Sequence, residues 1–497
     1  MKQTAARSDR AMWARLFALA PSRGRPLQTQ IREMLVGAIL DGWLPRGSPV
    51  PSGRDLADQL GVSRNTVVLA YQQLVDEGFL LSRERSGYYV CDGAVPGCAP
   101  AGADTDNAAG NGPDWARRFA VRASGQRNIC KPLNWQNYPY PFLYGQFDPT
   151  LFPIADWREC CRQALSVLEV RDWAPDGVDG DDPLLIEQLR TRVLPRRGVW
   201  AGAAEIMVTV GAQQALFLLA RLLGQERSVV GIEDPGYPDA RNIFAIQTPE
   251  VRPLAIDDQG LVPSAAAAGC DYIYLTPSHQ CPTTVTMPLA RRRALLELAA
   301  RHDIVLIEDD YESETNYLDC PTPALKSLDR DQRVLYIGSL SKTLAPGLRL
   351  GYIVGPAALI HEARALRRLM LRHPPANNQR IVALFLSLGH HEALLRRLAH
   401  VLKDRAAEVR RALARHLPDL TIAPSSGGSS LWLRGPETLD CQALAASARE
   451  RGVLIEPGEV FFNAARPPRN FFRLGFSSIA AVRIEPGIAE LAALIHR

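Results

Sequence analysis

The sequence predicts an α/β protein with a small helical N-terminal module, a linker and a large body built on a mainly parallel sheet. Two observations support this fold class. From about residue 147 onward, short apolar runs alternate with longer amphipathic stretches, which is typical of alternating strands and helices. Before them, residues 93–113 hold 14 Gly, Ala or Pro among 21 residues, so this segment cannot bury a core and is expected to be a linker.

Composition narrows the class of protein. The 497 residues are 46% hydrophobic and 22% charged, which is typical of a globular protein. We find no apolar run long enough for a membrane span and no signal-peptide core. The nine cysteines lack C-x-x-C spacing, so we expect neither a metal site nor a disulfide framework. This use of cysteine suits a cytoplasmic location. Residues 1–92 carry 12 Lys/Arg against 9 Asp/Glu, which favours a nucleic-acid module.

The N-terminal module is expected to be a winged helix-turn-helix. An amphipathic helix covers residues 27–41. Ser52 caps a second helix, Gly61 forms the turn after it, and Ser63 caps a third. The stretch 80–90 predicts a hairpin, the wing, with Arg85 near its tip. The residues that face outward at the start of the third helix, where base edges and phosphates would be contacted, are Arg64, Asn65 and Thr66.

The large body carries a lysine motif after a predicted strand. Gly338-Ser339-Leu340-Ser341-Lys342 is followed seven residues later by Arg349. The lysine amine suits a Schiff base with pyridoxal 5'-phosphate (PLP), while the hydroxyls and the guanidinium suit its phosphate. Another phosphate donor is expected at a strand-to-helix turn, Gly211-Ala212-Gln213, where backbone N–H groups are free.

Other residues in the same chain order suit the rest of the cofactor. Tyr237 could stack on the pyridine ring, and Asp309 could hold its nitrogen protonated. Tyr311 could reach the phenolic oxygen, and His279 lies in a loop expected along the ring edge. Arg473 could pair with a ligand carboxylate. Taken singly, each has a structural alternative, such as an ion pair for Arg473 or a satisfied polar contact for His279.

Strands and helices of the body follow from the apolar pattern. The expected strands are residues 205–210, 228–232, 271–275, 304–307 and 333–337, and the clearest helices are residues 213–223 and 289–300.

The N-terminal motifs resemble the GntR family. They are P-S-x-R-x-L-A from Pro51, S-R-x-T-V from Ser63 and A-Y-x-x-L-x-x-E-G from Ala70. This resemblance implies DNA contacts by residues of the second and third helices and close approach of the wing glycine to the minor groove. The DNA-binding residues so assigned are Ser52, Arg54, Arg64, Asn65, Thr66 and Gly87.

The lysine motif and its companions resemble fold-type-I aminotransferases, with large and small domains. The combination resembles the MocR/GabR family, which implies a homodimer, often head-to-tail. Expected boundaries are 20–91 for the DNA-binding domain, 92–127 for the linker and 128–497 for the PLP-binding effector domain.

Two departures from the family pattern bear on the ligand. Where many members have Y-G-D-P-x-G, this chain has the stretch 173–183. GABA-responsive members place an arginine two residues after the stacking tyrosine, whereas this chain has Asp239 there and Arg241 further on. Asp239 therefore predicts a diamino-acid-like effector, such as an ectoine breakdown product, with taurine, GABA or PLP itself as alternatives.

The sequence supports two functions. One is a PLP-dependent transcriptional regulator that senses an amino compound through an aldimine with PLP and controls amino-compound catabolic genes. The other is an active aminotransferase with an appended DNA-binding module. The complete helix-turn-helix and wing favour the regulator, with at most weak transaminase activity.

Overall fold

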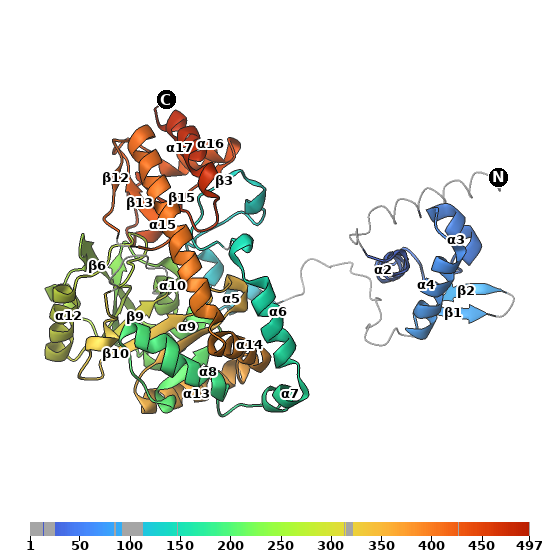
Figure 1. Cartoon of the computed structure of the whole chain (residues 1–497), viewed down its shortest axis with the longest axis horizontal. Coiled ribbons are helices and arrows are strands. Elements are labelled where there is room, and N and C mark those ends of the chain that lie inside the picture. The colour runs from blue at the N-terminus through green and yellow to red at the C-terminus, as the bar shows by residue number, and fades with distance from the viewer. Residues whose placement is uncertain are drawn as a thin grey trace. The chain divides into compact units, whose positions relative to one another are not determined.

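The computed structural model describes residues 13, 25–83, 86–91, 113–146, 148–312, 314, 322–425 and 427–496. Two compact units divide the chain, Met1–Arg118 and Phe119–Arg497 (Figure 1). Most of the expected linker, residues 92–112, lies outside the described part of the chain, as does Arg85 in the wing.

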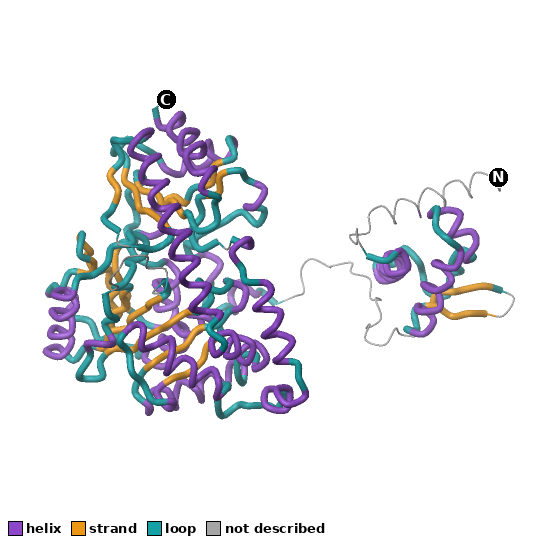
Figure 2. The backbone as a smooth tube through the Cα atoms, in the orientation of Figure 1, coloured by secondary structure: helices purple, strands orange, loops and turns teal. Residues whose placement is uncertain are grey.

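The winged helix-turn-helix expected from the sequence is present in the first unit (Figure 2). The hydroxyls of Ser52 and Ser63 accept backbone N–H groups of the helices that follow them, each at 3.2 Å, as the capping pattern predicted. Apolar faces of the helices and of the hairpin share one core, in which Ile31, Leu56 and Val67 are fully buried. The elements are α2 (Leu27–Leu40), α3 (Gly53–Leu60), α4 (Arg64–Asp76), β1 (Leu80–Arg83) and β2 (Gly87–Val90).

An eight-stranded sheet forms the centre of the second unit. Five neighbouring strands of it are parallel, while β11 runs antiparallel to both its neighbours and β7 antiparallel to β6. The strand order is β4 (Ile206–Thr209), β11 (Gly351–Val354), β10 (Val334–Ser339), β9 (Val305–Asp310), β8 (Tyr272–Leu275), β5 (Val229–Asp234), β6 (Glu250–Asp257) and β7 (Gly260–Leu261).

Helices cover both faces of this sheet, which is why β4, β8, β10 and β11 contain no charged residue. Along β4, Met207 joins the core on one face, whereas Ile206 and Val208 join the core on the other. The first face is covered by α9 (Gly211–Leu223), α10 (Pro238–Gln247) and α13 (Ala357–Leu371). The second face is covered by α6 (Ile154–Ala164), α8 (Pro183–Gln188), α14 (Ala376–Ser387), α11 (Ala265–Ala268) and α12 (Leu289–His302).

The C-terminal part forms a smaller sheet packed against three helices. It contains β12 (Thr421–Ile422), β13 (Ser430–Arg434), β16 (Phe471–Gly475), β15 (Glu456–Pro457), α15 (His390–His416), α16 (Cys441–Glu450) and α17 (Ala481–Ile495). A separate pairing of β3 (Tyr140–Pro141) with β14 (Val453–Leu454) holds the beginning of the second unit against this part. Within the described ranges, no helix is long and apolar enough to span a membrane.

The strands and helices expected from the apolar pattern are confirmed to within a few residues of their ends. The described end of the expected linker, residues 113–127, contains the short helix α5 (Trp115–Arg118) and a 3₁₀ turn at Ala123–Gly125.

Ion pairs hold the stretch 173–183, where the sequence departs from the family pattern. Asp181 accepts from Arg364 at 2.7 Å and from Arg367 at 2.6 Å, and Asp182 pairs with Arg380 at 2.6 Å. These arginines lie on α13 and α14. The carboxylates of Asp181 and Asp182 are therefore neutralised by arginines of these two helices.

Candidate functional site

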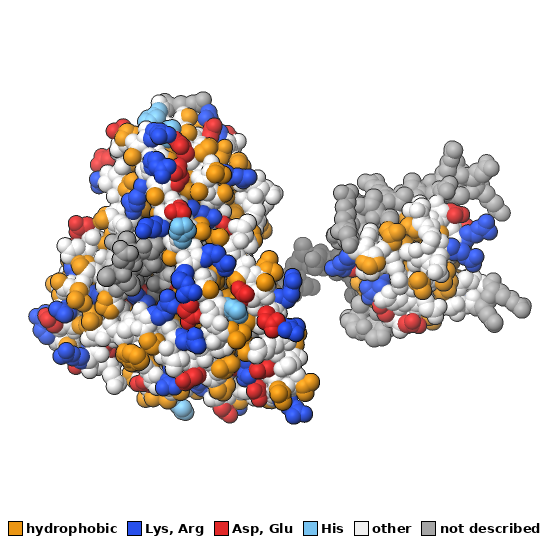
Figure 3. Space-filling view, in the orientation of Figure 1, with side chains coloured by type: hydrophobic (Ala, Val, Ile, Leu, Met, Phe, Trp, Pro, Cys, Tyr) orange, Lys and Arg blue, Asp and Glu red, His pale blue; other side chains and the backbone are white. Residues whose placement is uncertain are grey.

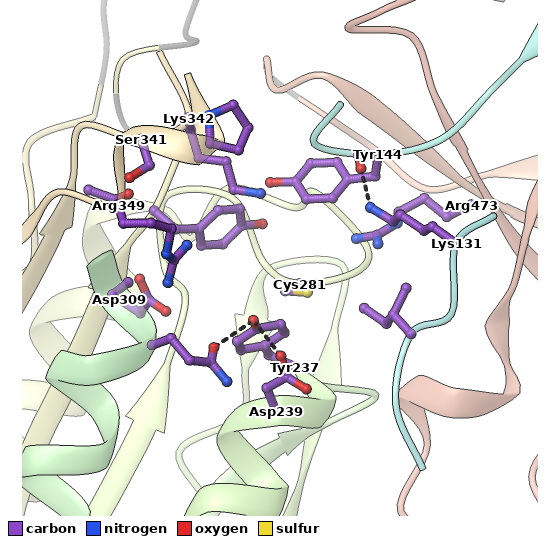
Figure 4. Close-up of a pocket in the computed structure, with 16 residues that line it drawn as sticks. Lys131, Tyr144, Tyr237, Asp239, Cys281, Asp309, Ser341, Lys342, Arg349 and Arg473 are labelled. Atoms are coloured by element: carbon purple, nitrogen blue, oxygen red, sulfur yellow. Dashed lines mark hydrogen bonds between the residues drawn. The ribbon is translucent and has the colours of Figure 1, made fainter. Parts of the chain in front are cut away.

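A cavity of about 340 Å³ opens at the carboxyl ends of the parallel strands (Figure 4). This is the edge at which open α/β sheets bind ligands, and the volume is in the range of small-molecule sites. The lining residues are Ile129, Lys131, Tyr144, Ala212, Gln213, Tyr237, Asp239, Cys281, Asp309, Tyr311, Ser339, Ser341, Lys342, Pro346, Arg349 and Arg473.

One end of the cavity is suited to a phosphate. The N-terminus of α9 opens there, and Gly211 has a positive φ of 73°. A Cβ at this position would lie 2.9 Å from an Arg349 nitrogen, so the glycine keeps space beside the guanidinium. Ser341 is fixed through its hydroxyl, which accepts the Leu350 N–H at 3.0 Å. The sequence-predicted phosphate ligands thus meet at one place.

Asp309 lies at the end of β9, and its two oxygens have different surroundings. Tyr274, fully buried on β8, donates its hydroxyl to Asp309 Oδ2 at 2.9 Å. Asp309 Oδ1 is buried and has no hydrogen-bond partner among the described residues. Burial raises the pKa of Asp309 to about 7, against the effect of the Tyr274 bond. The free oxygen would find its partner in a protonated pyridine nitrogen.

The neighbouring carboxylate points to the other face of the sheet, as strand alternation requires. Asp310 accepts from Arg197 and from Tyr336, each at 2.8 Å. The two aspartates therefore differ in role, since only Asp309 lines the cavity.

Lys342 projects its amine into the cavity just after β10. Its Nζ lies 4.5 Å from the centre of the Tyr144 ring. A Cβ at Gly145 would lie 2.6 Å from Nζ, so this glycine makes room for the amine. Burial, with the nearby Lys131 charge second, lowers the pKa of Lys342 to about 8. A neutral amine, the nucleophilic form, is therefore accessible near physiological pH.

Aromatic residues and the loop after β8 border the cavity. Tyr237 donates its hydroxyl toward Asp239 Oδ2 at 3.0 Å or Gln213 Oε1 at 3.1 Å. Tyr311 donates to the carbonyl of His279 at 2.8 Å. The His279 side chain is buried but does not line the cavity, and its Nδ1 has no partner within the described residues.

Two cations, Lys131 and Arg473, line the end of the cavity remote from Arg349, and both pair with the buried carboxylate of Glu456 behind them. Arg473 on β16 pairs with Glu456 on β15 at 2.7 Å, and Lys131 lies 3.2 Å from the other Glu456 oxygen. Arg473 Nη2 is buried and has no partner in the described part of the chain. Asp239 lines the cavity as expected, whereas Arg241 lies outside the lining and donates to the carbonyls of Val460 and Phe462.

Sequence reasoning missed several lining residues. Ile129, Lys131 and Tyr144 come from a segment without helix or strand periodicity, so no pattern drew attention to them. Cys281 directly follows the stretch 276–280 that contains His279, and this adjacency was the only available signal in the sequence.

The residues assigned to DNA lie on the surface of the first unit. Arg54, Arg64 and Asn65 are exposed, and Thr66 is half-buried with its hydroxyl 2.7 Å from Ser63 Oγ. Ser52 is exposed but its hydroxyl also donates to Asp55 at 2.6 Å. Gly87 is exposed and has a φ of 100°, a conformation that favours glycine. As a glycine, it leaves the wing without a side chain at this point. On the second unit, the face seen in Figure 3 shows basic and acidic side chains interspersed.

The cavity residues fit PLP. The Asp309 oxygen that has no partner within the described ranges suits the pyridine nitrogen, the buried amine of Lys342 suits the aldehyde, and the helix N-terminus beside Arg349 suits the phosphate. Gly211 and Gly145 leave room for the Arg349 guanidinium and the Lys342 amine at these two points.

Comparisons with known proteins agree with both units. Residues 182–489 match the family "Aminotransferase class I and II", and residues 27–90 match "Bacterial regulatory proteins, gntR family". The HTH-type transcriptional regulator TauR of Rhodobacter capsulatus is 44% identical over 476 residues, 96% of this chain and 98% of TauR. The probable rhizopine catabolism regulatory protein MocR of Rhizobium meliloti is 31% identical over 470 residues, 94% of this chain and 93% of MocR. A crystal structure of Pyrococcus horikoshii kynurenine aminotransferase matches with a TM-score of 0.69 at 26% identity, covering 77% of this chain and 98% of that one.

Proposed function

Because the chain belongs to the MocR/GabR-type family of GntR regulators with an aminotransferase-like domain, we propose that it is a PLP-dependent transcriptional regulator that senses an amino compound. The observation that carries this proposal is the pairing, in one chain, of a complete winged helix-turn-helix with a cavity that presents a buried lysine amine.

The cavity residues would hold the cofactor at three points. Lys342 would bond to the aldehyde carbon, Asp309 would accept from the pyridine nitrogen, and Arg349 with the N-terminus of α9 would bind the phosphate. When bound, PLP supplies an aldehyde group that reacts reversibly with primary amines. Tyr237 lies on the cavity wall where it can pack on the ring. A primary amine would compete with Lys342 for the same carbon.

Charges at the cavity wall support a proposal for the class of effector. Arg473 offers an anionic group a nitrogen that has no partner among the described residues, and Asp239 offers a carboxylate to a second amino group. A diamino acid or a related compound with one free carboxylate meets both requirements. GABA and taurine have the anionic group, but their single amino group is the one that would react with PLP, which leaves nothing to pair with Asp239.

Ligand exchange at Lys342 would shift the protein between two states with different DNA affinity. The first unit binds operator DNA through Arg54, Arg64 and Asn65 and through its wing. The proposal includes a cytoplasmic homodimer, since two copies of a helix-turn-helix would meet two half-sites.

A second candidate function is a working aminotransferase, because the cavity presents every residue that the cofactor chemistry requires. Steady-state transfer of an amino group from a natural donor, at more than a trace rate, would favour this candidate.

The test combines a spectrum with DNA binding. PLP-loaded protein is titrated with a panel of amines, including 2,4-diaminobutanoate, GABA and taurine, while the visible band of the lysine-linked cofactor is followed. The same samples are titrated with a duplex selected from a random pool. The proposal expects one amine to change both the spectrum and the DNA affinity. DNA binding that is indifferent to every amine and to PLP would contradict it.

A further inference from the structure

The segment 126–131 lies along the wall of the cavity and is anchored on both sides of it. Gln126 Nε2 donates to the carbonyl of Asn242 at 3.1 Å, and Asn242 Nδ2 donates to the carbonyl of Arg127 at 3.0 Å. On the other side, Arg127 donates to the carbonyl of Phe462 at 3.0 Å. The segment therefore bridges α10 and the loop before β16.

Two residues of this segment face the cavity. Ile129 lines the cavity and packs against the apolar cluster of Cys281, Trp432 and Phe461. Lys131 extends beside Arg473 (Figure 4). Asn128, which precedes Ile129, and Cys130, which lies between Ile129 and Lys131, are exposed. The chain thus alternates inward and outward here, and only the inward side chains contact the ligand space.

The charge around Lys131 is unbalanced. Lys131 Nζ and Arg473 both face Glu456, so two cations share one buried carboxylate. Lys131 also donates to the Tyr144 carbonyl, and Arg473 stacks on the Tyr144 ring at 4.2 Å. Since Arg473 is 2% exposed and its Nη2 has no partner in the described part of the chain, the cluster has room for one more anion.

We propose that Lys131 is a ligand-recognition residue, which together with Arg473 binds the anionic group of the amino compound and makes segment 126–131 sense ligand occupancy. This inference rests on the proposed function and adds to it a residue and a route. The route from the cavity to the first unit runs along the chain itself, because the second unit begins at Phe119 and segment 126–131 belongs to the stretch that follows this boundary. An anion drawn to Lys131 fixes this stretch, whereas a neutral amine leaves it as it was.

Lowered basicity of Lys131 is consistent with this role. Burial lowers the pKa of Lys131, and the nearby Arg473 charge lowers it further, against the effect of Glu456. A ligand anion between the two cations would relieve their repulsion.

The experiment uses full-length, PLP-loaded protein and matched amine pairs. Each of 3-aminopropanoate, 4-aminobutanoate and 2,4-diaminobutanoate is compared with its carboxamide, and taurine is included as a sulfonate. The variants are Lys131→Met, the conservative Lys131→Arg, and the control Lys403→Met on the exposed side of α15. Ligand affinity is read from the visible band, and hydrogen exchange is followed in peptides that cover residues 126–131.

Lys131→Met is expected to weaken binding of the anionic amine about 10- to 100-fold and to leave binding of the carboxamide within about threefold. The reason is that Lys131 makes a charge-assisted bond only to the anionic member of each pair. Lys131→Arg should restore most of the affinity, and Lys403→Met should behave as the parent protein. In the parent protein, only the anionic amine should slow exchange in segment 126–131.

Two results would overturn the inference and are distinguishable. If the parent protein responds to amines but Lys131→Met weakens both members of a pair equally, Lys131 is not an anion ligand while the proposed function stands. If no amine changes the spectrum of the parent protein, the proposed function fails and this inference fails with it.

Discussion

Tyr274→Phe offers a sharp test of how the cavity holds a cofactor. The substitution removes one hydroxyl, whose single bond within the described residues is to Asp309 Oδ2 at 2.9 Å. Asp309 is then left without a hydrogen-bond partner there, since Oδ1 already lacks one. The fully buried carboxyl group loses the interaction that favours its ionised form.

The magnitude follows from the bond type. A hydrogen bond to a charged group contributes about 1.5–3 kcal/mol, which is about one to two pKa units. The pKa of Asp309, about 7 with the bond present, should therefore rise well above neutrality without it. A neutral carboxyl pairs poorly with a pyridinium, so PLP affinity at pH 7.5 should fall about 10- to 100-fold.

The assay is a titration of cofactor-free protein with PLP between pH 6 and 9. The matched control is Tyr336→Phe, which removes an equally buried hydroxyl from the neighbouring Asp310, whose ion pair with Arg197 remains. This control should lose stability but bind PLP within about threefold of the parent protein. Equal PLP affinity of Tyr274→Phe and the parent protein, with the same pH dependence, would refute the role given to Asp309.

Three further predictions follow from the same geometry. The pKa of Asp309 is about 7 in the folded protein, so the folded state binds more protons than the unfolded state between about pH 4 and 7. The free energy of unfolding of the cofactor-free protein is therefore about 4 kcal/mol lower above pH 7 than it would be with an ordinary carboxyl. Asp309→Asn should therefore raise the melting temperature of cofactor-free protein at pH 8 but not at pH 4, while it abolishes tight PLP binding; an unchanged melting temperature at pH 8 would contradict this cost. The rate at which PLP links to Lys342 should rise as pH passes through about 8, since the neutral amine attacks, and a stopped-flow rate that is flat from pH 6.5 to 9 would count against the lowered pKa. Arg64→Ala should abolish sequence-specific DNA binding and reduce the salt dependence of residual binding by about one counterion, with PLP binding unchanged; an operator titration that matches the parent protein would remove Arg64 from the interface.

Local sequence signals were sufficient for the scaffold because each has a direct physical basis. Ser52 and Ser63 satisfy the first N–H groups of their helices, so their spacing located the helix-turn-helix. Strands buried on both faces must be apolar, so β5, β9 and β10 stood out in the sequence.

The cavity was only partly predictable because some of its residues are brought in by tertiary pairing. Lys131 and Tyr144 enter through the contacts of the first residues of the second unit with β14 and β15. No periodicity in that segment marks them. Arg473 and Asp239 were found from their motifs, whereas Arg241 belongs to the backbone contacts of the loop before β16.

An amine is expected to act on DNA binding through exchange at Lys342. The most direct measurement compares PLP-loaded protein before and after borohydride reduction, with the labelled peptide identified by mass and the DNA affinity measured with and without the active amine. We expect the label on Lys342 and a DNA affinity that the amine changes before reduction but not after it, because the reduced link cannot exchange. A label on another residue, or an amine effect that survives complete reduction, would show that exchange at Lys342 does not control DNA binding.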